Sequence, residues 1–211
     1  LTEGEITYLY TGFCMPGDES RHGAMLTVLG TDMLTIKEAP RFVVPSKPYE
    51  KDTGYEGHAF FEASSIRRVG ETYYFIYSSV LSHELCYATG NSPYGPFAYG
   101  GTIVSNCDLF IDSYKPAERP MYYGGNNHGS IVQIRKDWYI FYHRHTNGQN
   151  FGRQGCIEKI RFDENGKIPQ VMMTSCGANK GPLKGSGIYP AYIACSLYCL
   201  DEATMVGGPG E

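Results

Sequence analysis

The chain has 211 residues and a formal net charge of −4, and this length is enough for one domain with a hydrophobic core. The acidic balance excludes the basic face that nucleic-acid binding requires, and the apolar runs are too short for a membrane-spanning helix. The 18 Tyr, 10 Phe and 26 Gly, without long stretches of helix-forming residues, favour an all-β fold, because aromatic residues suit pleated sheets and Gly suits tight turns.

Short apolar and aromatic runs between turn signals predict a series of strands, and no helix longer than about two turns. In chain order, the predicted strands span 6–11, 24–29, 33–37, 59–66, 72–79, 84–88, 102–104, 129–134, 138–143, 155–161, 168–173 and 193–200. The seven Cys lack the spacings of a disulfide framework or a zinc site. We therefore predict that most of them are reduced core residues.

Two segments, 61–105 and 127–174, repeat the same order of strands. Each has a strand of small residues that ends in Ile, a tight turn, an aromatic strand, a strand with Cys and an edge strand. A partial copy without the first strand spans 6–44. A period of about 45 residues with four strands is typical of a β-propeller blade. We predict one propeller domain over 1–211, with blade-like units at about 1–56, 57–126 and 127–185 and a closing segment at 186–211.

Three blades are too few to close a ring, because propellers typically have four or more. An open propeller would expose strand edges and leave its core half empty. The sequence therefore predicts that the propeller is incomplete in this chain, and that an N-terminal polypeptide or an oligomer completes it.

An acidic residue, Glu62, stands inside an otherwise apolar predicted strand. Aligning the Ser-Ile pairs at 65–66 and 130–131 places Glu62 opposite Asn127, with His128 beside it. The first strand of a propeller blade lines the central channel, so we expect these polar side chains to face the channel. Carboxylates are rarely buried without a partner or a function, because desolvating their charge is costly.

Each candidate has a structural alternative. For Glu62 it is a salt bridge to a neighbour such as Arg67, and for His128 it is a hydrogen-bonded core histidine. His143 and His145 alternate at a strand end and so point to the same face. Surface or hydrogen-bonding roles suit that pair better than metal binding.

The segments HAFFEASSIRRVGETYYFIYSS, HELCYATGNSPYGPFAYGGTIVSN, NNHGSIVQIRKDWYIFYHRHTN and RQGCIEKI resemble glycoside hydrolase family 43, the group of β-xylosidases and α-L-arabinofuranosidases. The resemblance runs from YLYTGF to YPAYIACSLYC and so covers nearly the whole chain. It implies a five-bladed propeller and an inverting mechanism with three carboxylates. These are an Asp that acts as general base, a second Asp that orients the acid, and a Glu that acts as general acid.

By this resemblance, Glu62 in FFEASS is the general acid, which protonates the leaving oxygen while a base activates water. Asn127 and Arg153 match positions that contact sugar hydroxyls. His128 matches an axial His that lies beside a calcium ion or a water-filled channel centre. Calcium there would be held largely through water, because it prefers oxygen ligands, and no other cofactor is implied. Neither Asp has a match, so we expect both outside this chain.

The expected function is hydrolysis of arabinose- or xylose-containing plant polysaccharides, with arabinoxylan or xylo-oligosaccharides as substrates. The motifs do not separate xylosidase from arabinofuranosidase, and whether the chain is active alone stays open. The alternative is an inactive carbohydrate-binding or structural propeller fragment that needs a second chain. No nucleic-acid or membrane partner is expected.

Overall fold

The computed structural model describes residues 1–12, 14, 21–111, 125–146, 149–179 and 181–193. Over these residues the fold is all-β, with two short 3₁₀ turns at Lys47–Tyr49 and Ala191–Ile193. No helix in this part of the chain is long and apolar enough to cross a membrane. The chain divides into two compact units, Leu1–Leu81 with Cys86–Gly101, and Ser82–Leu85 with Thr102–Glu211.

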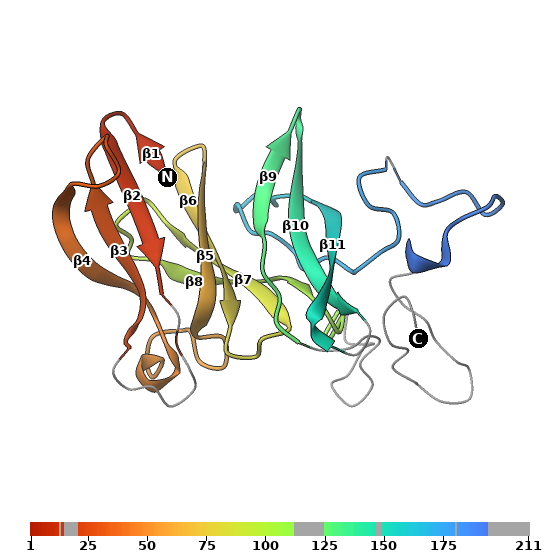
Figure 1. The fold of residues 1–211 in the computed structure, drawn as a ribbon, viewed down its shortest axis with the longest axis horizontal. Helices are drawn as coiled ribbons and strands as arrows, with labels where there is room; N and C mark the ends of the chain where they lie inside the picture. Colours follow the sequence, from red (N-terminus) through yellow and green to blue (C-terminus); the bar gives the residue numbers. More distant parts are fainter. Residues whose placement is uncertain (13, 15–20, 112–124, 147–148, 180, 194–211) are drawn as a thin grey trace. The chain divides into compact units, whose positions relative to one another are not determined.

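The first sheet has four antiparallel strands in chain order, β1 to β4 (Figure 1). Their bounds are Thr2–Glu3, Ile6–Thr11, Gly23–Leu29 and Ile36–Pro45. The strand predicted at 33–37 is wrong at its start, because Asp32 builds a turn there. The Asp32 carboxylate accepts the backbone N–H groups of Leu34 at 3.1 Å and Thr35 at 2.9 Å, so the strand begins only after this turn.

The second sheet orders its four strands β5-β6-β7-β8, and the third orders three strands β11-β10-β9. The bounds of β5 to β11 are Phe60–Val69, Thr72–Ser79, Glu84–Gly90, Ala98–Ser105, Ser130–Ile134, Asp137–Thr146 and Gln149–Ile160. The two first strands share one register: Ile66 lies opposite Phe75, and Ile131 opposite Ile140. Each of these Ile residues stands three positions before the last residue of its strand. The repeat inferred from the sequence is therefore confirmed for the first hairpin of each unit, whereas among the described residues the third sheet has three strands and not four.

The last two predicted strands have different outcomes. Residues 168–173 form no strand, and only Val171 pairs, in an isolated bridge with Val104. The Met173 N–H instead bonds to the Asp108 carboxylate at 2.8 Å, and the Gln170 side chain donates to the Leu109 carbonyl at 3.1 Å. Hydrogen bonds that involve the side chains of Asp108 and Gln170 thus take the place of a regular strand ladder. The strand predicted at 193–200 lies outside the described residues, apart from residue 193.

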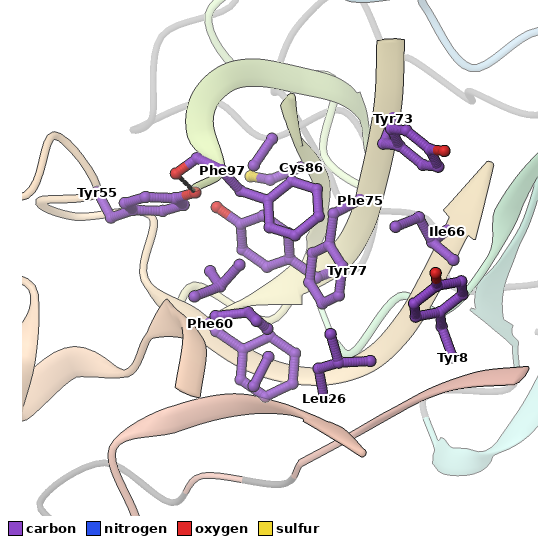
Figure 2. Close-up of a cluster of buried hydrophobic side chains, with 14 of the residues drawn as sticks. Tyr8, Leu26, Tyr55, Phe60, Ile66, Tyr73, Phe75, Tyr77, Cys86 and Phe97 are labelled. Atoms are coloured by element: carbon purple, nitrogen blue, oxygen red, sulfur yellow. Dashed lines mark hydrogen bonds between the residues drawn. The ribbon is translucent and has the colours of Figure 1, made fainter. Parts of the chain in front are cut away.

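The core of the first unit is a cluster of buried, largely aromatic side chains to which β2, β3, β5, β6 and β7 all contribute (Figure 2). Phe60, Phe75 and Tyr77 are fully buried, with ring centroids 6.0–6.3 Å apart. Two Cys, Cys14 and Cys86, lie in the same cluster as free thiols, which confirms the reduced core role predicted for them. The buried aromatic strand therefore fixes β5, the strand that carries Glu62.

Glu158 in β11 anchors the segment that follows the third sheet through hydrogen bonds. Its carboxylate accepts the Thr174 N–H and the Thr174 hydroxyl, both at 2.7 Å. Burial is the largest cause that raises the pKa of Glu158, and the nearby Asp108 adds to it, although the bonds from Thr174 and Tyr142 act in the opposite direction. Folding therefore favours the protonated form of this buried carboxyl group.

Two substitutions of Glu158 should distinguish the stability that its hydrogen bonds contribute from the stability that depends on its charge. Because its folded-state pKa is raised, the stability it contributes is fully present below the ordinary pKa of Glu and is lost as pH rises through the raised value. Glu158→Gln keeps an acceptor oxygen for the Thr174 N–H, and its NH₂ group can donate to the Thr174 hydroxyl, without the charge, so it should weaken this pH dependence. Glu158→Ala leaves the Thr174 N–H unpaired and should cost about 1–3 kcal/mol. Urea unfolding between pH 4.5 and 8 measures both effects, and a Gln variant less stable than the Ala variant would contradict this account.

Candidate active site

Glu62 lies between two irregularities of β5. Phe60 is opposite Ser79, Glu62 is opposite Ser78, and Ser65 is opposite Ile76, so β5 carries an extra residue on each side of Glu62. Ala63, directly after it, has a φ of +65°, which is uncommon for a residue other than Gly. Such bulges bend a strand, re-aim its side chains and are over-represented beside active sites.

The strand that carries Glu62 is anchored on the N-terminal side of this residue. Phe60 is fully buried, whereas Glu62 itself is half-buried. The carbonyl of Phe61 accepts the N–H of Cys14 at 2.8 Å, which anchors the strand at this point. Arg67 donates to the Ile66 carbonyl at 2.7 Å. The double bulge thus leaves one half-buried carboxyl group on a strand that the core holds in place.

Asn127 belongs to the second unit, where it precedes β9 and is fully buried. Its amide nitrogen donates to the Asn106 side-chain oxygen at 3.2 Å and to the His83 carbonyl at 3.4 Å. Its amide oxygen is buried without a hydrogen-bond partner. The network therefore fixes the amide, while its acceptor oxygen is buried without a partner in the protein.

His128 is the first member of a histidine row with His143 and His145. The ring centroids of His128 and His143 are 5.3 Å apart at an interplanar angle of 79°, and those of His143 and His145 are 5.8 Å apart at 1°. His145 is buried, and its Nε2 donates to the Asn126 side-chain oxygen at 2.7 Å. A Cβ atom at Gly125 would lie 2.3 Å from its Nδ1, so the row needs a glycine there.

Arg153 lies in β11 opposite His145, and its side chain is exposed. Burial is the main cause that lowers the pKa of His143 to about 4, and Arg153, His128 and His145 lower it further. Burial, Arg153 and His128 also lower the pKa of His145. Both rings are therefore neutral at neutral pH.

The structure gathers Asn127, His128 and Arg153 in the second unit, whereas Glu62 belongs to the first. His143 and His145 were not predicted as site residues, although the structure places their rings in a row with that of His128. Their alternation along one strand indicated a shared face, which is confirmed, and the hydrogen-bonding role expected for the pair is confirmed at His145. A surface position is wrong for His145, because the ring is buried.

The side chains around His128 fit a calcium ion poorly. The neighbouring rings offer nitrogen atoms, and calcium takes six to eight oxygen ligands. Arg153 adds a positive charge that acts on the same rings. In this part of the described chain, water would have to supply most of a calcium shell.

Comparison with known proteins matches residues 3–168 to the model of glycosyl hydrolases family 43. The chain is 70% identical over 203 residues to a xylosidase/arabinosidase of Thermoclostridium stercorarium. The aligned region covers 96% of this chain and 43% of that protein. It is 33% identical over 158 residues to a xylosidase/arabinosidase of Bacteroides ovatus, over 72% of this chain and 43% of that protein. The chain thus spans less than half the length of these curated relatives.

Solved structures of similar enzymes match the fold of this chain. A GH43_1 enzyme of Xanthomonas citri has 25% identity and a TM-score of 0.61, over 79% of this chain and 53% of that one. The β-xylosidase RS223 has 28% identity and a TM-score of 0.60, over 78% of this chain and 54% of that one. The three sheets are therefore part of a family 43 β-propeller that is incomplete in this chain. On its sequence and its fold, the chain belongs to glycosyl hydrolase family 43.

Proposed function

We propose that this chain is part of a glycosidase that hydrolyses xylose- or arabinose-containing plant polysaccharides, with arabinoxylan and xylo-oligosaccharides as substrates. The observation that carries the proposal is the half-buried Glu62 between two bulges of β5, inside the family match. Two relatives are named xylosidase/arabinosidase, and a similar enzyme of Xanthomonas citri was solved with xylotriose. These names support pentose-containing substrates.

In the proposed mechanism, Glu62 donates its proton to the oxygen of the departing sugar. A general base removes a proton from water, and this water attacks the anomeric carbon from the opposite face, so that the configuration inverts. Arg153 and the amide of Asn127 are proposed to hold sugar hydroxyls. The two proton transfers need no cofactor, and no step passes through a metal at His128.

The general base and the acid-orienting Asp are proposed to come from polypeptide outside these 211 residues. The chain spans 43% of the Thermoclostridium stercorarium relative, so that relative has ample length for both. An N-terminal polypeptide is the proposed source, either continuous with this chain or supplied by a partner. An inactive carbohydrate-binding fragment is the second candidate, and it predicts binding of xylo-oligosaccharides without turnover.

The configuration of the first-formed product tests the proposed reaction. Proton NMR of the full-length protein acting on p-nitrophenyl β-xyloside, which releases a single xylose, should show α-xylose before mutarotation, because inversion converts the β-linkage to the α-anomer. First-formed β-xylose would contradict the inverting mechanism. Binding of xylobiose without any hydrolysis would instead favour the second candidate.

A further inference from the structure

Three exposed aromatic rings gather at one end of the first sheet. The ring centroids of His22 and Tyr49 are 4.2 Å apart at an interplanar angle of 47°, and those of His22 and Phe42 are 6.5 Å apart. Tyr49 is 38% exposed and Phe42 46%, and His22 is exposed as well. Aromatic side chains stabilise a fold mainly by burying their surface, which these rings do only in part. An exposed cluster of this kind often marks a binding surface.

Ser46 holds two of these rings on a fixed backbone. It is fully buried, its N–H donates to the His22 carbonyl at 2.8 Å, and its carbonyl accepts the Tyr49 N–H at 2.9 Å. Its hydroxyl donates to the Arg21 carbonyl at 2.7 Å. Both ring-bearing residues are thus positioned without a ligand, so a ligand that binds them has little additional backbone to order.

The same serine connects the cluster to the strand that carries Glu62. Ser46 pairs with Phe60 in an isolated parallel bridge, and Phe60 begins β5 two positions before Glu62. From the spacing of paired strands and the rise along a strand, the Cα atoms of Ser46 and Glu62 lie within roughly 13 Å of each other. A polymer of several sugar units that occupies the surface beside Glu62 is therefore long enough to reach the rings.

The chemistry of the cluster suits a sugar. A pyranose ring has faces of C–H groups and a rim of hydroxyl groups, so it matches a flat ring whose edge carries hydrogen-bonding atoms. His22 and Tyr49 both have such a face and such an edge, the first with two nitrogens and the second with a hydroxyl. Lys47, two positions before Tyr49, is exposed and adds hydrogen-bond donors beside them. A polysaccharide fits this mixture of groups better than a purely apolar protein surface would.

We propose that His22, Tyr49 and Phe42 form an aromatic platform that binds sugar units of an arabinoxylan chain beyond the unit on which Glu62 acts. This inference rests on the proposed function, from which it takes the class of its ligand. The platform touches no reacting atom. It should therefore strengthen the binding of the polymer, whereas a substrate with a single sugar unit is too short to use it.

Affinity electrophoresis through gels that contain arabinoxylan tests the platform in the full-length protein. All samples carry Glu62→Gln, which keeps the polymer intact. His22→Ala and Tyr49→Ala should each weaken binding about 2- to 10-fold, the range for one aromatic contact, and Tyr49→Phe, which keeps the ring, should retain most of the affinity. Leu34→Ala is the matched control, because it removes an 84% exposed side chain from the turn at the other end of the same sheet. Unweakened binding by a folded double variant, His22→Ala with Tyr49→Ala, would overturn the proposal.

NMR gives a second readout that needs no substitution in the platform. The ring signals of His22 in full-length Glu62→Gln protein should shift when xylohexaose is added and stay unshifted with xylose at the same concentration. If the double variant does not fold, His22 signals that xylohexaose leaves unshifted would overturn the proposal.

Kinetics with Glu62 intact separate the platform from the proposed function. The double variant should raise KM for arabinoxylan and change kcat/KM for p-nitrophenyl β-xyloside by less than about 2-fold, the loss of one weak contact. Equal losses on both substrates would overturn the platform, because the two rings would then act on the reaction site or the fold. A wild-type protein that hydrolyses neither substrate would contradict the proposed function, and the gel and NMR measurements would still decide whether the platform binds the polymer.

Discussion

Replacing Glu62 with Gln in the full-length protein is expected to lower kcat for xylobiose by about 10²–10⁴-fold, the usual contribution of a general acid. Gln has nearly the same size as Glu, so the double bulge around this position should survive. It has no acidic proton for the leaving oxygen, so KM should change much less than kcat. Release of xylose measured by chromatography gives both constants.

The leaving group separates proton donation from a structural role. A 2,4-dinitrophenolate leaves without protonation, so Glu62→Gln should slow 2,4-dinitrophenyl xyloside far less than xylobiose. Glu71→Gln is the matched control, because the Glu71 side chain is 94% exposed and forms a surface ion pair with Arg68. Equal losses on both substrates would mean that Glu62 maintains the fold, and unchanged activity on xylobiose would remove it from the mechanism.

The sequence predicted the parts of the fold that depend on local pattern. The run of aromatic and apolar residues in 72–79 and the tight turn before it give the bounds of β6 as predicted. The alignment of the two Ser-Ile pairs correctly predicted that Ile66 and Ile131 hold the same place in their hairpins. The register of such hairpins can be predicted from the sequence because a two-residue turn fixes the pairing of the strands on either side of it.

Other features depend on contacts between distant residues. An alternating pattern cannot show that β5 gains an extra residue on each side of Glu62, because bulges arise only in the pairing with β6. The predicted strand at 168–173 failed because Asp108, 65 positions away, captures the Met173 N–H. The contact of His128 with His143 likewise joins two elements, so their spacing along the chain carries no signal for it.

Assayed without further polypeptide, the 211-residue chain is expected to hydrolyse xylobiose about 10²–10⁴-fold more slowly than the full-length protein, because no base would deprotonate the attacking water. Xylose release measured on both proteins under the same conditions tests this. Glu62→Gln should lower the residual rate of the isolated chain further if the acid still works there. A chain that matches the full-length rate would show that the base is among its own residues, contrary to our proposal.

Azide distinguishes a missing base from a missing substrate site. Azide attacks carbon without losing a proton, so it needs no general base. On 2,4-dinitrophenyl β-xyloside, which also needs little help from Glu62, azide should raise the rate of the isolated chain and give α-xylosyl azide by inversion. The full-length protein, which has its base, should gain little from azide and is the control. A folded chain that shows no azide effect would mean that outside polypeptide supplies sugar contacts as well as the base, because Arg153 and Asn127 would then be too few to hold the sugar in place.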